Sequence, residues 1–72
     1  MKLRAGQVSI GDTFVKVGGY SRVVYAVDSL VQSDVIPPHV RLLASGQSER
    51  MLVSVSALLD RHIWLRVPSE QS

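Results

Sequence analysis

The sequence contains no cysteine, only two histidines and only four aromatic residues among its 72. Without cysteine the chain has no disulfide framework and no thiolate metal site. Two histidines are too few for a four-ligand structural zinc site unless carboxylates or a partner chain complete it. We therefore expect neither a metal nor a cofactor.

Long hydrophobic runs are also absent. No segment approaches the roughly 18–20 apolar residues that a membrane-spanning helix needs. Residues 1–12 lack the continuous apolar stretch of a signal peptide. These features predict a soluble, cytoplasmic protein that does not bind a membrane.

The length predicts one domain over residues 1–72, with an ordered core at about 10–67 and a short polar C-terminal tail. Apolar residues make up 46% of the chain, which is enough for a compact core. Because small domains often gain stability by oligomerisation, we keep a homodimer as an alternative to a monomer.

The charged residues are dispersed as single residues rather than gathered in runs. Eight Lys and Arg against six Asp and Glu give a net charge of +2. A nucleic-acid-binding protein more typically concentrates its cations on one patch. Folding can still bring scattered arginines together on one face, so nucleic-acid binding is kept as the alternative function.

Alternating apolar residues and turn signals predict an all-β domain of five short strands with one helical turn. Gly18-Gly19 and Ser45–Ser48 are expected turns, and Pro37-Pro38 stiffens the longest connection. The helical turn is expected at Ser56–Arg61, with Ser56 as its N-cap. The predicted strands are Thr13–Val17, Arg22–Leu30, Val40–Ala44, Arg50–Val55 and His62–Val67.

The segment Met51–Val67 carries the clearest pattern in the chain. Met51, Val53 and Val55 form an apolar strand face before the helical turn. After it, Ile63, Leu65 and Val67 alternate with more polar or aromatic neighbours, and we expect these three to close the core.

Two short motifs resemble small bacterial SH3-like barrels. Gly11-Asp12-Thr13-Phe14 is similar to the opening signal of these domains, and Val53–Leu58 is similar to their junction between a strand and a helical turn. The resemblance implies a single five-stranded SH3-like β-barrel with one helical turn before the last strand, similar to an uncharacterised family.

Three functional branches of this architecture are compared with the chain. Peptide-binding SH3 domains use clustered aromatics, and Tudor-type domains use an aromatic cage. This chain has only Phe14, Tyr20, Tyr25 and Trp64, and their spacing requires neither arrangement. Type II dihydrofolate reductases use a Val-Gln-Ile-Tyr run where this chain has 50–53, Arg-Met-Leu-Val, so no reductase role is implied.

One set of residues is a candidate binding site. His62, Trp64 and Arg66 alternate on the last predicted strand, so they would share one face and form a recognition strip. The competing interpretation is that Trp64 covers the end of the barrel and Arg66 packs its stem alongside.

A hydrolase reading has little support. Asp60 and His62 lie near Ser54 and Ser56 in the sequence, but neither serine sits in a nucleophile-elbow pattern. We therefore predict no catalytic residue and no enzyme. The prediction is a protein-interaction or accessory module with a protein partner.

Overall fold

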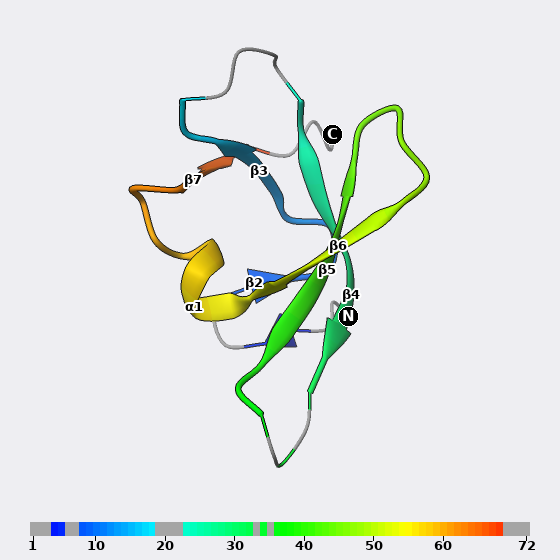
Figure 1. Cartoon of the computed structure of the whole chain (residues 1–72), viewed down its shortest axis with the longest axis vertical. Helices are drawn as coiled ribbons and strands as arrows, with labels where there is room; N and C mark the ends of the chain where they lie inside the picture. The colour runs from blue at the N-terminus through cyan, green and yellow to red at the C-terminus, as the bar shows by residue number, and fades with distance from the viewer. Residues whose placement is uncertain (1–3, 6–7, 19–22, 33, 35, 69–72) are drawn as a thin grey trace.

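Two antiparallel β-sheets and one short helix make up the described part of the chain (Figure 1). The computed structural model describes residues 4–5, 8–18, 23–32, 34 and 36–68. The elements are β1 (Arg4–Ala5), β2 (Val8–Ser9), β3 (Thr13–Lys16), β4 (Tyr25–Val31), β5 (His39–Ala44), β6 (Arg50–Ser54), α1 (Val55–Leu58) and β7 (Trp64–Val67).

The larger sheet has five strands in the order β6-β5-β4-β3-β7, and every neighbouring pair is antiparallel. Its edge strands, β6 and β7, do not pair with each other within the described residues, so the sheet is open there. β1 and β2 form a separate two-stranded sheet. The expected mostly-β chain with one short helix before the last strand is confirmed.

The Gly11-Asp12 turn joins the small hairpin to the main sheet. Gly11 has a φ of +97°, a backbone conformation that residues with a Cβ atom rarely adopt. Its N–H donates to the Val27 carbonyl at 2.9 Å, and the Val27 N–H donates to the Asp12 carbonyl at 2.8 Å. The Asp12 carboxylate accepts from the Ser9 N–H at 2.9 Å. These bonds tie residues 9–12 to β4.

The sequence did not predict strands before residue 10, yet the structure places β1 and β2 there. Val8 in β2 is fully buried and belongs to the hydrophobic core. A two-residue strand is too short to show an alternating pattern, which is why the sequence alone does not indicate it.

A β-bulge in β4 resolves the ambiguous faces of that strand. The register with β5 shifts between Val27 and Ser29, so Val27 pairs with Leu42 and Leu30 pairs with Val40. One extra residue reverses the alternation of side chains. Val27 and Leu30 therefore both pack on the core although they are three positions apart.

The core lies on one face of the main sheet and is completed by α1 and β2. Phe14, Leu42 and Leu58 are its largest fully buried side chains. The full cluster consists of Val8, Phe14, Val27, Val40, Leu42, Val55, Leu58 and Trp64.

The helical turn lies earlier than expected: its N-cap is two residues earlier, and it ends at Leu58 rather than at Arg61. Ser54, not Ser56, is the N-cap, and its hydroxyl accepts from the Ala57 N–H at 3.2 Å. The shift follows from burial: Val55 leaves β6 to become the first helical residue and is buried with Leu58. Met51 remains 37% exposed, so the expected apolar face Met51–Val53–Val55 is only partly buried.

Candidate functional site

The connection from α1 to β7 determines how the candidate residues lie. The Asp60 carbonyl accepts from the N–H groups of Ile63 and Trp64, at 3.0 and 2.9 Å. The Asp60 N–H in turn donates to the Ala57 carbonyl at 3.1 Å. This tight turn places the start of β7 at Trp64, so His62 lies in the turn and outside the strand.

Asp60 and His62 form a local polar pair. One carboxylate oxygen, Oδ1, accepts from the His62 N–H at 2.9 Å and contacts the ring Nδ1 at 3.2 Å. The backbone bond is the largest cause, and the ring bond the second, of a lowered pKa of Asp60. The His62 side chain itself is 96% exposed.

Trp64 is buried, with 5% of its surface exposed. Its indole meets the Tyr25 ring edge to face, with the ring centroids 5.1 Å apart and the planes at 86°. This geometry is favourable between aromatic rings. Trp64 therefore belongs to the core and anchors β7 to it.

Arg66 lies half-exposed beside the core. Its guanidinium carbon is 5.0 Å from the centre of the Phe14 ring, and Nη1 donates to Asp12 Oδ2 at 2.7 Å. The register places Phe14 directly opposite Arg66 on the neighbouring strand. Stacking and ion pairing together hold the guanidinium in one place.

The predicted face assignment of the last strand is wrong for Ile63 and Leu65, which are 40% and 48% exposed. The reason is that a buried indole covers more core area than either side chain, and the turn at Asp60 starts the strand with Trp64 facing inward. Consequently His62, Trp64 and Arg66 do not form one continuous exposed strip: one is in a turn, one is buried and one is half-exposed.

A groove opens between α1 and β7, with a volume of about 490 Å³. It includes two residues of the predicted strip, Trp64 and Arg66. Leu59 and Leu65 add partly exposed apolar surface, and Arg61 adds an exposed cation. The described residues that line it are Phe14, Leu58, Leu59, Arg61, Trp64, Leu65 and Arg66.

Sequence reasoning did not include the leucines or Arg61 in the site. One signal was available in the adjacent pair Leu58-Leu59. A single helical turn that packs on a core buries only one of two consecutive side chains, so the other must face outward. Leu58 is 1% exposed and Leu59 is 37% exposed.

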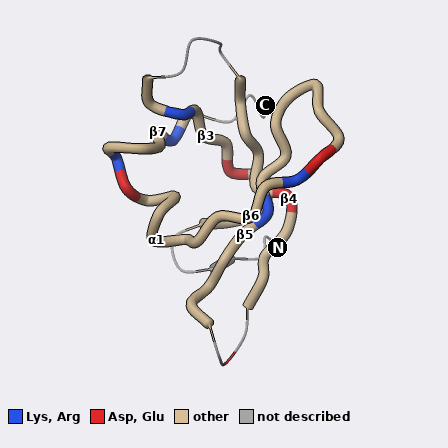
Figure 2. Tube along the Cα trace, viewed as in Figure 1, with Lys and Arg blue, Asp and Glu red and all other residues tan. Residues whose placement is uncertain are grey.

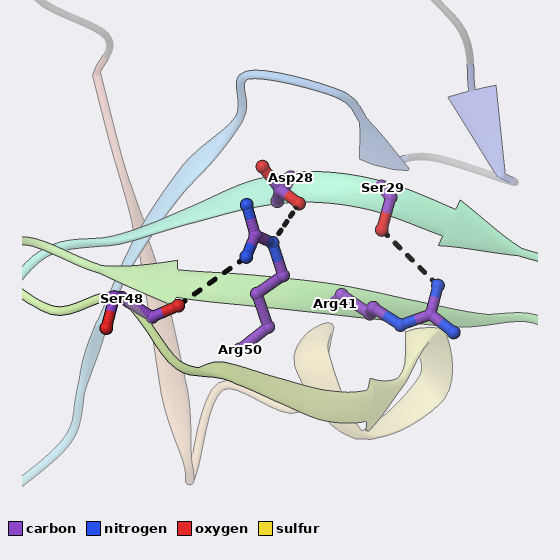
Figure 3. Close-up of polar contacts among 5 residues, drawn as sticks. All are labelled: Asp28, Ser29, Arg41, Ser48 and Arg50. Carbon is purple, nitrogen blue, oxygen red and sulfur yellow. Dashed lines mark hydrogen bonds and ion pairs between the residues drawn. The ribbon is translucent and has the colours of Figure 1, made fainter.

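The outer face of β4, β5 and β6 carries a second group of polar residues (Figure 3). Arg50 forms an ion pair with Asp28 across β5 and also reaches the Ser48 carbonyl at 3.5 Å. Within the described residues, Arg41 hydrogen-bonds only to the Ser29 hydroxyl, at 3.5 Å, and forms no ion pair. Asp28 thus pairs with one of the two cations described on this face.

Cations are distributed over separate parts of the molecule. Figure 2 shows basic residues on β3 and β7, in the turn after α1, and on the side of β5 and β6. Arg50 and Arg66 are each paired with an aspartate. Within the described residues the cations therefore do not gather into a single basic face.

The geometry of a catalytic triad is not assembled in the described region. Asp60 does contact His62, but the Ser54 hydroxyl caps α1 and lies 3.4 Å from the Ser56 hydroxyl. The same region holds no group of three or more His, Asp or Glu residues arranged to bind a metal. It also holds no helix of the length and apolarity required to cross a membrane.

Comparison with known proteins found no family model, no curated protein and no solved structure that matches this chain.

Proposed function

We propose that this chain is a small, non-enzymatic protein-interaction module with an SH3-like barrel. The groove between α1 and β7 is its binding site. The strand order β6-β5-β4-β3-β7, with α1 between β6 and β7, supports this architecture. Small SH3-like barrels commonly close with a strand, one turn of helix and a short last strand.

The observation that carries the proposal is the combination of exposed leucines and cations at one groove. Leu59 and Leu65 offer apolar surface that water would otherwise cover. Arg61 is exposed and has no ion-pair or hydrogen-bond partner within the described residues. Among the described residues that line the groove, none is acidic.

These features favour an extended protein segment that carries both apolar and acidic side chains. A leucine-like side chain would pack between Leu59 and Leu65, and a neighbouring carboxylate would pair with Arg61. Arg forms planar, bidentate hydrogen bonds with carboxylates. The charge on the groove therefore selects an acidic partner over a basic one.

The chain contains its own reporter for this binding. Trp64 is the single tryptophan and lines the groove, so its fluorescence reports changes there. We would titrate the protein with two acetylated hexapeptides, one with two leucines flanked by glutamates and one with the glutamates replaced by lysines. The acidic peptide should shift the Trp64 emission and the NMR signals of the groove.

Arg61→Glu and Arg41→Glu form a matched pair of variants. Both exchange an exposed arginine for glutamate, but Arg41 lies on the outer face of the sheet. Arg61→Glu should weaken binding of the acidic peptide about tenfold, equivalent to about 1.4 kcal/mol. Arg41→Glu should leave it unchanged.

Two outcomes would overturn the proposal. One is equal binding of the acidic and basic peptides, or binding of neither. The other is retention of the protein on heparin with a steep salt dependence, which would favour the nucleic-acid alternative.

A further inference from the structure

The outer edge of β6 is unpaired within the part of the chain that the structure describes. Residues 50–54 pair on one side with β5, from Arg50 opposite Leu43 to Ser54 opposite His39. No described strand pairs with the other side. An edge of this kind presents backbone N–H and C=O groups that can bind another strand.

β6 also lacks the features that usually protect an edge. The strand contains no proline and no lysine, and its register with β5 shows no bulge. Leu52 is 57% exposed and Met51 is 37% exposed. The single charged side chain, Arg50, points across β5 to Asp28.

We propose that the edge of β6 pairs with β6 of a second copy of this chain. The two strands would run antiparallel around a two-fold axis through Leu52. Arg50 would then lie opposite Ser54 of the second copy, Met51 opposite Val53, and Leu52 opposite Leu52. This surface is separate from the groove between α1 and β7, so the inference does not depend on the proposed function.

Side-chain orientation supports this register. Met51 and Val53 pair with the buried residues Leu42 and Val40, so both belong to the core side of the sheet. Leu52 pairs with exposed Arg41 and belongs to the outer side. Directly paired residues of antiparallel strands share a face. The two-fold pairing therefore matches apolar with apolar on both faces.

The five residues of β6 all take part only when the axis passes through Leu52. Moving the axis to Met51 or Val53 would pair part of the strand with the preceding turn or with α1. In an antiparallel pair the axis cannot fall between residues, because side chains of opposite faces would then be paired.

Charge also permits the pairing. Arg50 lies opposite Ser54 of the second copy rather than opposite the second Arg50. Arg41 is one strand away from Leu52, so the two Arg41 residues are three strand spacings apart, roughly 14 Å. This exceeds the Debye length of about 8 Å at physiological ionic strength, and the repulsion is screened.

A five-residue pairing buries less surface than a standard protein interface, so the dimer should be reversible and depend on concentration. The absence of native cysteine allows a direct test of the register. With the axis at Leu52, Leu52→Cys places the two cysteines opposite each other. Paired Cα atoms in antiparallel strands lie about 4.5–5.5 Å apart, within the range for a disulfide.

Leu65→Cys is the matched control, because Leu65 is a similarly exposed leucine on the other edge strand, β7. Under mild oxidation Leu52→Cys should form covalent dimers faster than Leu65→Cys. A mixture of Met51→Cys and Val53→Cys should crosslink better than either variant alone, since these positions face each other only in this register.

Sedimentation of the unmodified chain provides a second measurement. Its mass should rise toward that of a dimer with concentration, and Leu52→Lys, which places two cations opposite each other, should remain a monomer. Equal crosslinking of the two cysteine variants would overturn the proposal. A monomer at the highest attainable concentration would also overturn it.

Discussion

The indole of Trp64 meets the phenol ring of Tyr25 edge to face, with their centroids 5.1 Å apart, although the two residues lie on strands separated by β3. This contact joins the last strand to the centre of the sheet through the core. Trp64 belongs to the same buried cluster as Phe14 and Leu58.

Trp64→Ala should destabilise the domain by about 3–5 kcal/mol, the range for removing a buried aromatic side chain. A small domain has a total stability of only about 5–15 kcal/mol, so much of the population would unfold. Trp64→Phe retains an aromatic ring and should cost less. Urea denaturation followed by circular dichroism measures both, and a near-zero cost for Trp64→Ala would show that the indole is not a core anchor.

The ion pair between Arg66 and Asp12 should contribute less to stability than the hydrogen bond that Asp12 accepts from the Ser9 N–H. Both side chains are partly exposed, so we expect a coupling energy of about 1 kcal/mol or less. Asp12 also accepts from the Ser9 N–H, so Asp12→Ala should cost about 1–2 kcal/mol more than Arg66→Ala. A double-mutant cycle with Asp12→Ala and Arg66→Ala separates these effects. Equal costs for the two single variants would contradict the role of Asp12 in the turn.

Ser54 and Ser56 should differ in their effect on stability although they are two residues apart. Ser54 caps α1, and Ser54→Ala should cost about 1 kcal/mol because the Ala57 N–H loses its acceptor. Ser56 is exposed within the helix, so Ser56→Ala should leave stability unchanged or slightly raise it. Thermal unfolding compares the two variants. A larger loss of stability for Ser56→Ala than for Ser54→Ala would instead support Ser56 as the N-cap.

The Asp60 carboxyl should titrate below the ordinary value of 3.8, because two His62 groups hydrogen-bond to its charged form. A lowered pKa in the folded chain means that the carboxylate stabilises the turn fully above the ordinary pKa. That contribution is lost as the pH falls through the lowered value. Carbon-13 NMR of the carboxyl group measures the midpoint directly.

His62→Ala provides the control for this titration. The variant removes the ring contact but keeps the backbone N–H bond, which is the largest cause of the lowered pKa. Its Asp60 midpoint should therefore lie between that of the unmodified chain and 3.8. A full return to 3.8 would assign the effect to the imidazole ring alone.

Local pattern predicted the elements that extend over several residues. The apolar run Val40–Ala44 and the Ser45–Ser48 turn signal, which includes Gly46, correctly indicated a strand followed by a turn. Gly46 has a φ of +78°, which a glycine adopts readily. The β1–β2 hairpin was missed because each strand has only two residues.

Burial on short elements was harder to predict. Apolar alternation assigned Ile63 and Leu65 to the core, whereas the structure buries Trp64 on the opposite face of the same strand. Both faces of β7 carry hydrophobic residues, so the alternation of side chains alone cannot predict which face is buried. The choice depends on the turn at Asp60, just before the strand, and on contact with Tyr25, which is remote in the sequence.

The sequence by itself determined a mostly-β chain, its principal strands and turns, and the position of one helical turn before the last strand. These follow from side-chain periodicity and from the backbone preferences of glycine and proline, which act within a few residues. Tertiary structure alone decided the inward face of β7, the groove between α1 and β7, and the unpaired edge of β6. Each of these depends on contacts between segments far apart in the chain, and local propensity carries no information about such contacts.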